Sequence, residues 1–420
     1  MEDKDKLNWV LKANNTNIIK VVGVGGGGGN AVNHMYKEGI QDVSFVLCNT
    51  DRQALMESAV PTRVLLGPTV TSGLGAGNVP EKAREAAEES VEEIRNVLAD
   101  GTKMVFVTAG MGGGTGTGAA PVIAKIAKEL GILTVGIVTI PFLFEKKPKV
   151  DQALNGAEAI RENVDALLVI NNERLREIYP ELTMSNAYKL ADETLLIAAK
   201  SIAEIITLPG VVNLDFADVS RVLKDGGSAV MSSGFGKGED RVKCALEDAL
   251  HSPLLNNKNV FDAQKILFNI YSSKQNELKV EEMNYVDDFM EKFDSNIEVI
   301  WGWAIDDKLG EEVKITVLAT GFGVKESLDP SDDNERKLQE LRDVFYPGSF
   351  GSSFSRRNIP KPTLLSEEQM DDDTIISLLE NNPAYCRDAK VLQQIKNALL
   401  VKEDNQQAPT ITGENIINFN

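Results

Sequence analysis

The sequence predicts an α/β protein with two α/β domains, a long helix that connects them and a flexible C-terminal tail. Three observations predict this fold class. From Asn17 to about Thr139, short β-branched runs alternate with helical patterns, as in the β-α-β crossovers of a parallel sheet. An apolar stripe at helical spacing follows and stops at Pro209-Gly210. Beyond Gly323 the composition shifts to Ser, Asp, Glu, Asn and Pro, which cannot sustain a core.

The first half is predicted to be a Rossmann-like parallel-sheet domain over residues 17–184, after an extension over residues 1–16. Its expected strands are Ile18–Val24, Val43–Cys48, Met104–Thr108 and Thr134–Thr139. Its expected helices have apolar residues at spacings of three and four and are Asn30–Glu38, Glu81–Ala99 and Ala119–Leu130. This half is therefore interpreted as a nucleotide-binding domain.

The second half begins with the connecting helix, expected over residues 185–209. A second α/β domain is expected over residues 210–323. It is predicted to contain the helices Phe216–Leu223 and Asp240–Leu250 and the strands Glu298–Ile305 and Val313–Thr320.

Two segments are expected after the second domain. Residues 324–380 are predicted to be a flexible linker, in which Glu335–Phe345 has the pattern of a short helix. Residues 381–420 are predicted to be a partner-binding tail. Its stretch Ala389–Val401 has apolar residues at helical spacing, which suits either docking or a solvated helix.

Charge and composition exclude several classes of partner. The net charge of −19 disfavours nucleic acid and anionic membrane surfaces. No apolar run is long enough to cross a bilayer, and the polar start lacks the apolar core of a secretory signal, so we expect a cytoplasmic protein. Cys48, Cys244 and Cys386 are too far apart to predict a disulfide framework or a metal site, and Cys48 is expected to be a small buried hydrophobe.

The first of two glycine-rich loops runs from Gly23 to Asn30, after a strand and before a helix. Backbone without side chains can approach phosphate oxygens closely at such a position. Gly23, Gly25 and Gly28 also satisfy the dinucleotide GxGxxG spacing, and Asp51 follows the next strand where a ribose-binding acid is expected. Taken alone, this loop is also compatible with the alternative that the protein is a Rossmann oxidoreductase.

The second loop, Gly110–Gly118, has six glycines in nine residues and also joins a strand to a helix. Two such turns at neighbouring strand ends would aim two helix N-termini into one crevice, which suits a triphosphate. Thr115 and Thr117 add hydroxyls for phosphate or Mg²⁺. A third segment, Gly73–Glu81, is interpreted either as a cover for the γ-phosphate or as a turn before a helix start at Pro80.

The motifs together resemble the tubulin/FtsZ family of GTPases. The run GGGTGTG matches that family, and further motifs occur in the order of its FtsZ branch, over about Asn17 to Gly323; they are Gly26–Asn30, Asn49-Thr50-Asp51, Gly110–Gly118, Pro141-Phe142-Leu143-Phe144-Glu145 and Asn213–Asp218. The resemblance implies GTP/GDP with Mg²⁺ as ligands. It implies phosphate contacts from Gly26, Gly27, Gly28, Gly29, Asn30, Gly114, Thr115 and Gly116.

The same resemblance implies ribose contacts from Glu145 and Lys149, and guanine recognition by Asn172, Asp192 and the stacking aromatic Tyr188. Lys149 stands where the family usually has Arg, so a point charge replaces a planar fork. For Asp192, a carboxylate can accept from both guanine N1–H and the exocyclic amine. An acid early in a helix also favours the helix dipole.

The candidate catalytic residues are Asn213, Asp215 and Asp218, just after the connecting helix. Two carboxylates three residues apart at a helix start share one face, but they also suit an N-cap arrangement. A connecting helix about 30 Å long separates them from their own phosphate loops. The resemblance implies that this synergy loop, in the activation domain, completes the active site of the next subunit in a head-to-tail filament.

The resemblance also implies a biological setting, the ring at the mid-cell division site; filaments for plasmid segregation or cell shape remain an alternative. The segment Asn382–Arg387 resembles the peptide through which the family binds membrane-tethering adaptors and division regulators. Cys386 and Asp388 depart from its usual hydrophobic and basic pattern, and about thirty residues follow it.

Overall fold

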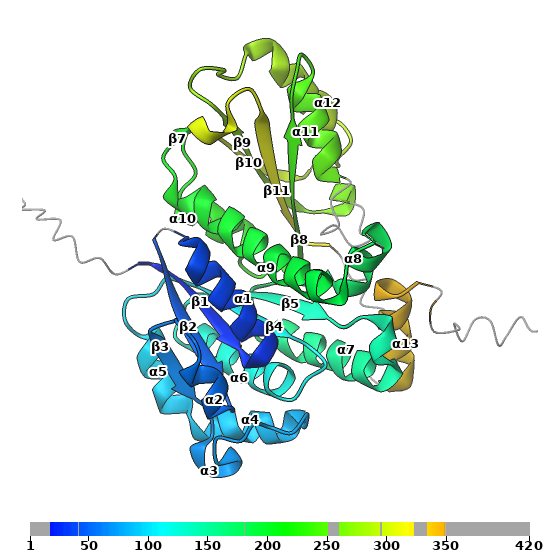
Figure 1. The fold of residues 1–420 in the computed structure, drawn as a ribbon. Coiled ribbons are helices and arrows are strands. Elements are labelled where there is room, and N and C mark those ends of the chain that lie inside the picture. The colour runs from blue at the N-terminus through cyan, green and yellow to red at the C-terminus, as the bar shows by residue number, and fades with distance from the viewer. Residues whose placement is uncertain are drawn as a thin grey trace, which may run out of the picture. The chain divides into compact units, whose positions relative to one another are not determined.

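In the part of the chain that the structure describes, eleven strands form one mixed β-sheet, in the order β3-β2-β1-β4-β5-β6-β8-β11-β9-β10-β7 (Figure 1). The structure is a computed structural model that describes residues 17–322, except 41, 180, 251–259 and 295, and residues 334–347 and 349. All of these belong to one compact unit of the chain, residues 1–351. None of the helices in the described ranges is long and apolar enough to span a bilayer.

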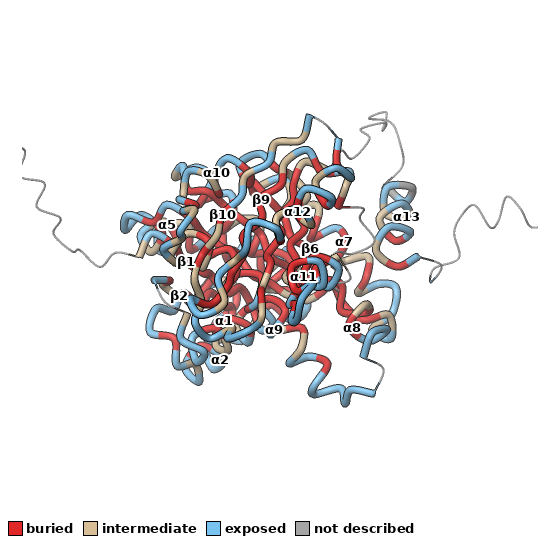
Figure 2. The backbone as a smooth tube through the Cα atoms, turned by 90° about the horizontal axis from the view of Figure 1, so that it is seen from above, coloured by how far each residue is buried: buried red, intermediate tan, exposed pale blue. Residues whose placement is uncertain are grey.

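The first six strands of this order are parallel, and their side chains are mostly buried. They are β1 (Ile19–Val24), β2 (Val43–Asn49), β3 (Thr62–Leu65), β4 (Met104–Gly110), β5 (Leu133–Ile140) and β6 (Ala166–Asn171). Continuous apolar runs suit parallel strands because helices cover both faces, and Figure 2 shows these buried strands inside a shell of exposed helix surface. The predicted parallel sheet is confirmed.

The helices of this half follow their strands closely. They are α1 (Gly25–Glu38), α2 (Arg52–Met56), α3 (Pro68–Thr71), α4 (Pro80–Glu89), α5 (Val91–Leu98), α6 (Thr115–Glu129), the 3-10 turn η1 (Leu143–Glu145), α7 (Lys147–Arg161) and α8 (Asn172–Ile178). The single helix predicted over Glu81–Ala99 is wrong, because it breaks at Ser90. The Ser90 hydroxyl oxygen accepts a hydrogen bond from Gly67 N at 3.0 Å, which ties the break to the chain after β3.

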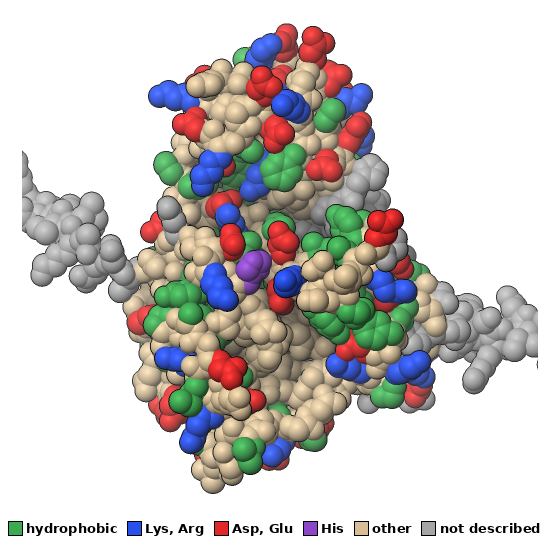
Figure 3. Space-filling model, viewed as in Figure 1, with side chains coloured by type: hydrophobic (Ala, Val, Ile, Leu, Met, Phe, Trp, Pro, Cys, Tyr) green, Lys and Arg blue, Asp and Glu red, His purple; other side chains and the backbone are tan. Residues whose placement is uncertain are grey.

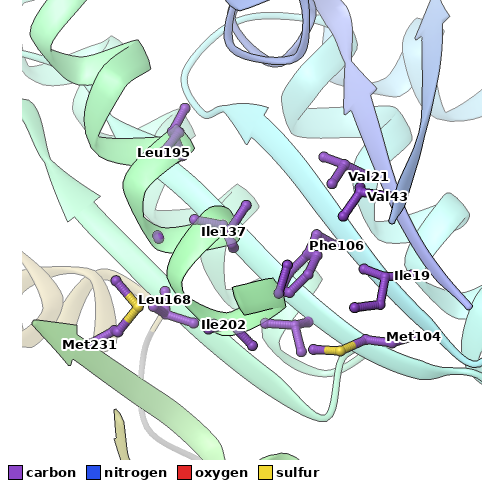
Figure 4. Close-up of a cluster of buried hydrophobic side chains, with 14 of the residues drawn as sticks. Ile19, Val21, Val43, Met104, Phe106, Ile137, Leu168, Leu195, Ile202 and Met231 are labelled. Atoms are coloured by element: carbon purple, nitrogen blue, oxygen red, sulfur yellow. The ribbon is translucent and has the colours of Figure 1, made fainter. Parts of the chain in front are cut away.

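The long helix α9 (Met184–Thr207) covers one face of the sheet, and its apolar stripe is buried as predicted. Thr183 caps it by accepting from Asn186 N. Figure 4 shows its Leu195 and Ile202 among side chains of the sheet strands. A second cluster fills the other face, beneath α4, α5, α6 and α7. These two layers fix the strand ends that carry the glycine loops.

The second half continues the same sheet, because β6 pairs with β8 in parallel. Its elements are β7 (Gly210–Val212), α10 (Phe216–Leu223), β8 (Gly227–Gly236), α11 (Arg241–Leu250), η3 (Val260–Asp262), β9 (Lys265–Ser272), η4 (Val280–Glu282), α12 (Met283–Met290), β10 (Glu298–Ile305), η5 (Asp307–Leu309) and β11 (Val313–Thr320). The predicted bounds of α10, β10 and β11 are confirmed residue for residue. A third core cluster lies between these strands and helices α11 and α12.

A last helix, α13 (Asn334–Phe345), lies within the segment expected as a linker and matches the short helix expected there. It packs beside α7, and Tyr346 just after it is 2% exposed. The extension 1–16, the rest of the linker and the tail, with Asn382–Arg387 and Ala389–Val401, lie outside the described residues.

Cys48 is buried as predicted, and this burial raises the pKa of its thiol to about 12. A thiol with so high a pKa stays protonated at neutral pH, which suits a packing role.

Candidate nucleotide-binding site

The two glycine loops meet at neighbouring ends of the sheet. Strands β1 and β4 pair in parallel with Gly23 opposite Thr108, and α1 and α6 begin just beyond them. A Cβ on Gly25 would lie 2.9 Å from Gly116 N, and one on Gly27 would lie 3.2 Å from the Gly110 Cα. The loops therefore touch, and two helix N-termini converge there, which favours an anion.

The helix α1 starts earlier than the sequence predicts, at Gly25 rather than Asn30. The glycine run is therefore the first turns of the helix, held by contact with the second loop rather than by helix propensity. A Cβ on Gly28 would approach Thr108 O to 2.2 Å, whereas one on Gly26 or Gly29 would meet nothing within 4 Å. Gly28 is thus needed for close packing, and Gly26 and Gly29 face open space.

The third glycine segment lies against the second loop. A Cβ on Gly114 would come within 3.1 Å of Ala76 and Asn78 and 3.0 Å of Val79 N, and one on Gly116 would come within 2.6 Å of Gly110 O. The segment Gly73–Glu81 therefore stands beside the candidate phosphate position. Figure 3 shows on this side of the molecule a hollow whose walls are mostly backbone and uncharged polar side chains.

The hydroxyls at this end divide into two roles. Thr115 Oγ1 and Thr50 Oγ1 are 2.7 Å apart. Thr117 is 6% exposed, and its oxygen accepts from Gly112 N at 2.9 Å, so the described contact of this hydroxyl is within the loop and its service to a phosphate or Mg²⁺ stays a prediction. This hydrogen bond stabilises the turn. Thr50 was missed as a site residue, although the match at Asn49-Thr50-Asp51 marked its neighbourhood.

Asp51 has a structural role. It caps α2, accepting on Oδ1 from Gln53 N at 2.8 Å and from Ala54 N at 3.3 Å. A carboxylate engaged as an N-cap already has its hydrogen-bond partners. The position that kept the oxidoreductase alternative open is therefore an N-cap.

The candidate ribose residues Glu145 and Lys149 come together. Glu145 Oε2 and Lys149 Nζ form an ion pair at 2.5 Å, and Glu145 Oε1 accepts from Phe142 N at 3.0 Å. The Tyr188 ring stands edge-on to Phe142, with 5.3 Å between centroids. Burial, and then the nearby Glu145 charge, raise the pKa of Tyr188. Tyr188 therefore shares one corner with the pair.

Glu173 supports the same loop and was missed from the sequence. It is 3% exposed, and its Oε2 accepts from Leu143 N at 2.9 Å. No local pattern marks it, because the contact joins segments 30 residues apart.

The candidate guanine residues line the start of α9 and the end of β6. Asn30 and Asp192 line one pocket of about 720 Å³. Burial raises the pKa of Asp192 to about 6. Asn172 is buried, and its Oδ1 has no hydrogen-bond partner among the described residues. A buried acceptor without a partner and a half-buried carboxylate fit a base that presents N–H donors, as guanine does.

The candidate catalytic residues lie elsewhere. Strand β7 is an edge strand, seven positions from β4 and so about 33 Å away along the sheet. Figure 1 shows α9 running from the side that carries α8 to the side that carries β7 and α10. Asn213, Asp215 and Asp218 are therefore not brought together with the glycine loops of their own chain.

The capping interpretation of these acids is confirmed. Asp215 Oδ1 accepts from Ala217 N at 2.8 Å and Asp218 N at 3.0 Å, and Asp218 Oδ2 accepts from Asp215 N at 3.0 Å. Asn213 Oδ1 accepts from Gly210 N at 3.0 Å and closes the preceding turn. Asp215 is nevertheless exposed, so its carboxylate remains accessible.

Comparison with known proteins identifies the family. Residues 18–180 match the model of the tubulin/FtsZ family, GTPase domain; residues 227–323 match the FtsZ family, C-terminal domain; and residues 362–400 match the model described as FtsZ, C-terminal. The cell division protein FtsZ of Porphyromonas gingivalis is 51% identical over 90% of this chain and 87% of its own length. The cell division protein FtsZ of Coxiella burnetii is 47% identical over 73% of this chain and 79% of its own length.

Comparison with solved structures supports the same family. An empty FtsZ dimer from M. jannaschii has a TM-score of 0.67 and 39% identity, over 75% of this chain and 94% of its own. CetZ2 from Haloferax volcanii, a GTPγS-bound protofilament at 21% identity, shares the fold with a TM-score of 0.63 over 78% of this chain and 98% of its own. With paired glycine loops in this fold, the chain belongs to the tubulin/FtsZ family of GTPases, among its FtsZ cell-division proteins.

Proposed function

We propose that this GTPase assembles head to tail into filaments of the ring at the mid-cell division site, in the cytoplasm, and hydrolyses GTP between adjacent subunits. One observation carries the proposal: the acidic loop after β7 and the glycine loops lie at different ends of α9, about 36 Å long for its 24 residues. A contact between unlike ends repeats without closing, which produces filaments. The FtsZ dimer and the CetZ2 protofilament are assemblies of related folds.

The nucleotide would be held as follows. The backbone of Gly26–Gly29, with Asn30, and the turn Gly114–Gly116 bind the phosphates, where two helix N-termini favour negative charge. Thr115 donates a hydroxyl, oriented by Thr50. Mg²⁺ accompanies the phosphates, as it commonly does at nucleotide sites. Charge on the phosphates is thereby compensated before any bond is broken.

The ribose and the base would lie beside the second group of candidate residues, away from the glycine loops. Glu145 and Lys149 bind the ribose, and Tyr188 stacks on the base. Asn172 and Asp192 accept from the base, which guanine matches with its N1–H and exocyclic amine. The buried unpaired Oδ1 of Asn172 supports this assignment.

The acids of the next subunit would orient the attacking water. Both capping bonds of Asp215 end on Oδ1 and that of Asp218 ends on Oδ2, so each carboxylate has a second oxygen for a water molecule. Asn213 assists from the preceding turn. Phosphoryl transfer needs such positioning more than covalent chemistry.

A mixing experiment tests hydrolysis between subunits. Asp215→Asn keeps an N-cap side chain but removes the charge, so it should bind GTP and lose turnover. Gly29→Asp should lose GTP binding and keep its acidic loop. We expect turnover in the mixture to exceed the sum of the two separate activities. A mixture no more active than that sum, or full turnover by Asp215→Asn alone, would refute the proposal.

We also propose that the tail binds a membrane-tethering adaptor and division regulators through Asn382–Arg387, within the C-terminal family match at residues 362–400. An aromatic and an arginine on one short segment are good anchors for a groove. Deletion of residues 381–420 should spare GTP-dependent sedimentation and abolish recruitment to adaptor-bearing vesicles. Recruitment that survives the deletion would contradict this assignment.

A further inference from the structure

The segment after α13 contacts the loop that carries the candidate ribose residue Glu145. Tyr346 lies 205 residues from Pro141, yet its hydroxyl donates to Pro141 O at 2.6 Å, and its side chain is 2% exposed. The amide of Asn171 donates to Phe345 O, directly before Asn172. Both hydrogen bonds therefore end on the segments proposed to hold the ribose and the base.

Two carboxylates hold the same short loop as the Tyr346 hydroxyl. Glu145 accepts from Phe142 N, and Glu173 accepts from Leu143 N, so both acids hold the loop after Pro141. Burial, and then the charges of Glu173 and Glu145, raise the pKa of Tyr346, which keeps the hydroxyl a neutral donor. The tyrosine and the two acids thus fix one short loop from several directions.

The helix α13 is anchored independently of this tyrosine. Arg342 is 2% exposed and donates from Nε to Asp151 Oδ1 at 2.7 Å, two residues after Lys149 on α7. Lys337 Nζ lies 3.3 Å from Glu158 Oε2 on the same helix. Leu341 and Phe345 pack against the core cluster beneath α7. The helix is therefore a fixed support for Tyr346.

We propose that Tyr346 is a positioning residue for the nucleotide, which holds the loop Pro141–Glu145, and with it the Glu145–Lys149 pair, in its binding geometry. This inference rests on the proposed assignment of Glu145 to the ribose. Coupling of this kind is reciprocal, so a bound nucleotide also stabilises the docked state of α13.

The test is calorimetry of GDP binding to the full chain, because GDP avoids turnover during titration. Tyr346→Phe removes the hydroxyl and keeps the aromatic ring. Loss of one buried hydrogen bond behind the loop should weaken GDP binding by roughly tenfold. The matched control is Thr320→Val on β11 in the second half, which also removes a buried hydroxyl that donates to a backbone carbonyl, Val222 O at 2.8 Å, and should leave GDP affinity unchanged.

Two readouts separate positioning from a general loss of fold. A positioning role changes the dissociation constant at unchanged stoichiometry, whereas partial unfolding lowers the stoichiometry. The amides of Leu143 and Glu145 should also exchange faster in Tyr346→Phe. Affinity within twofold of the unmodified protein, or a lowered stoichiometry at unchanged affinity, would overturn the proposal.

The variant Glu145→Ala tests the ribose assignment of Glu145 separately from the positioning role of Tyr346. If Glu145→Ala weakens GDP binding and Tyr346→Phe does not, the positioning role is refuted and the ribose assignment stands. If neither weakens binding, both are refuted. If both weaken it, and the double variant is no weaker than Glu145→Ala, the tyrosine acts through Glu145 as proposed.

Discussion

The hydroxyls of Thr50 and Thr115 lie 2.7 Å apart and join the end of β2 to the first residue of α6. Thr50 is fully buried, and its carbonyl accepts from Gly75 N at 3.0 Å in the third glycine segment. A single residue after β2 therefore links the two loops that flank the candidate triphosphate position, with one contact through its side chain and one through its backbone.

Replacing Thr50 by Val should weaken GTP binding. The change keeps the β-branched shape but removes the partner that orients the Thr115 hydroxyl, so we expect a dissociation constant about tenfold higher. Equilibrium dialysis with GTP in excess Mg²⁺ measures it. Thr134→Val is the control, because it removes another buried hydroxyl, bonded to Ile132 O at 2.9 Å, at the start of β5. Equal weakening in both variants would contradict a specific role for Thr50.

Charge placed at Gly29 should prevent nucleotide binding without disturbing the fold. A Cβ there meets nothing within 4 Å, so a side chain fits, but a carboxylate would face the phosphates. We expect Gly29→Asp to bind GTP at least tenfold more weakly than Gly29→Asn, which has nearly the same size. Both should retain the melting temperature of the nucleotide-free protein. Equal affinity in the two variants would show that the phosphates lie elsewhere.

GTP binding should weaken as the pH falls through the pKa of Asp192, which burial raises to about 6. Guanine donors require the ionised carboxylate, so below that pH the side chain must release a proton before it can bind. At pH 5 the dissociation constant should be about tenfold higher than at pH 7.5. The measurement is the GTP affinity of the unmodified protein divided by that of Asp192→Asn, at each pH. Titration of the GTP phosphates affects both proteins equally, so it cancels in this ratio.

A control removes the histidine near this site. His34 lines the same pocket as Asp192, so its contribution to the pH dependence must be separated from that of the carboxylate. In a His34→Gln background the pH dependence should persist. If it disappears there, or if Asp192→Asn shows the same dependence, the histidine or another group is responsible.

The elements of the fold could be predicted where local pattern and packing agree. The helix Phe216–Leu223 was found with its true bounds because Asp215 is a strong N-cap and a helical apolar pattern follows it. The start of α1 could not be found, because glycine has low helix propensity and the contact between Gly27 and Gly110 that holds it is a tertiary one.

The site could be predicted only in part. Glycine runs that follow strands indicate a phosphate site from local sequence alone. The guanine-binding role of Asp192 was predicted from the family resemblance. The contacts Thr50–Thr115, Leu143–Glu173 and Pro141–Tyr346 have no local pattern, because they depend on how separate segments are brought together by the sheet. Glycine-rich loops are therefore easier to predict than the residues that support them.

The last prediction concerns the stability of the second half, which rests on a buried ion pair. Arg241 Nε donates to Glu282 Oε1 at 2.7 Å and its NH2 group donates to Oε2 at 3.0 Å, and both side chains are 8% exposed. Arg241 also donates to the carbonyls of Asn276 and Glu277. Burial alone would raise the pKa of Glu282, but the hydrogen bonds from Arg241 and from Lys279 N, together with the charges of these two residues, outweigh it and hold this pKa below its usual value.

Glu282→Ala should destabilise the protein by about 3–5 kcal/mol, because it leaves the Arg241 charge buried without a counterion. Thermal unfolding followed by circular dichroism measures the loss, and Glu311→Ala, in the exposed pair with Lys237, should leave the melting temperature unchanged. Since the folded pKa of Glu282 lies below its unfolded value, the stabilisation is present above the unfolded pKa and is lost as pH falls through the folded one. The gap in melting temperature between the unmodified protein and Glu282→Ala should therefore narrow in acid, and a gap that widens would contradict the ion pair as its cause.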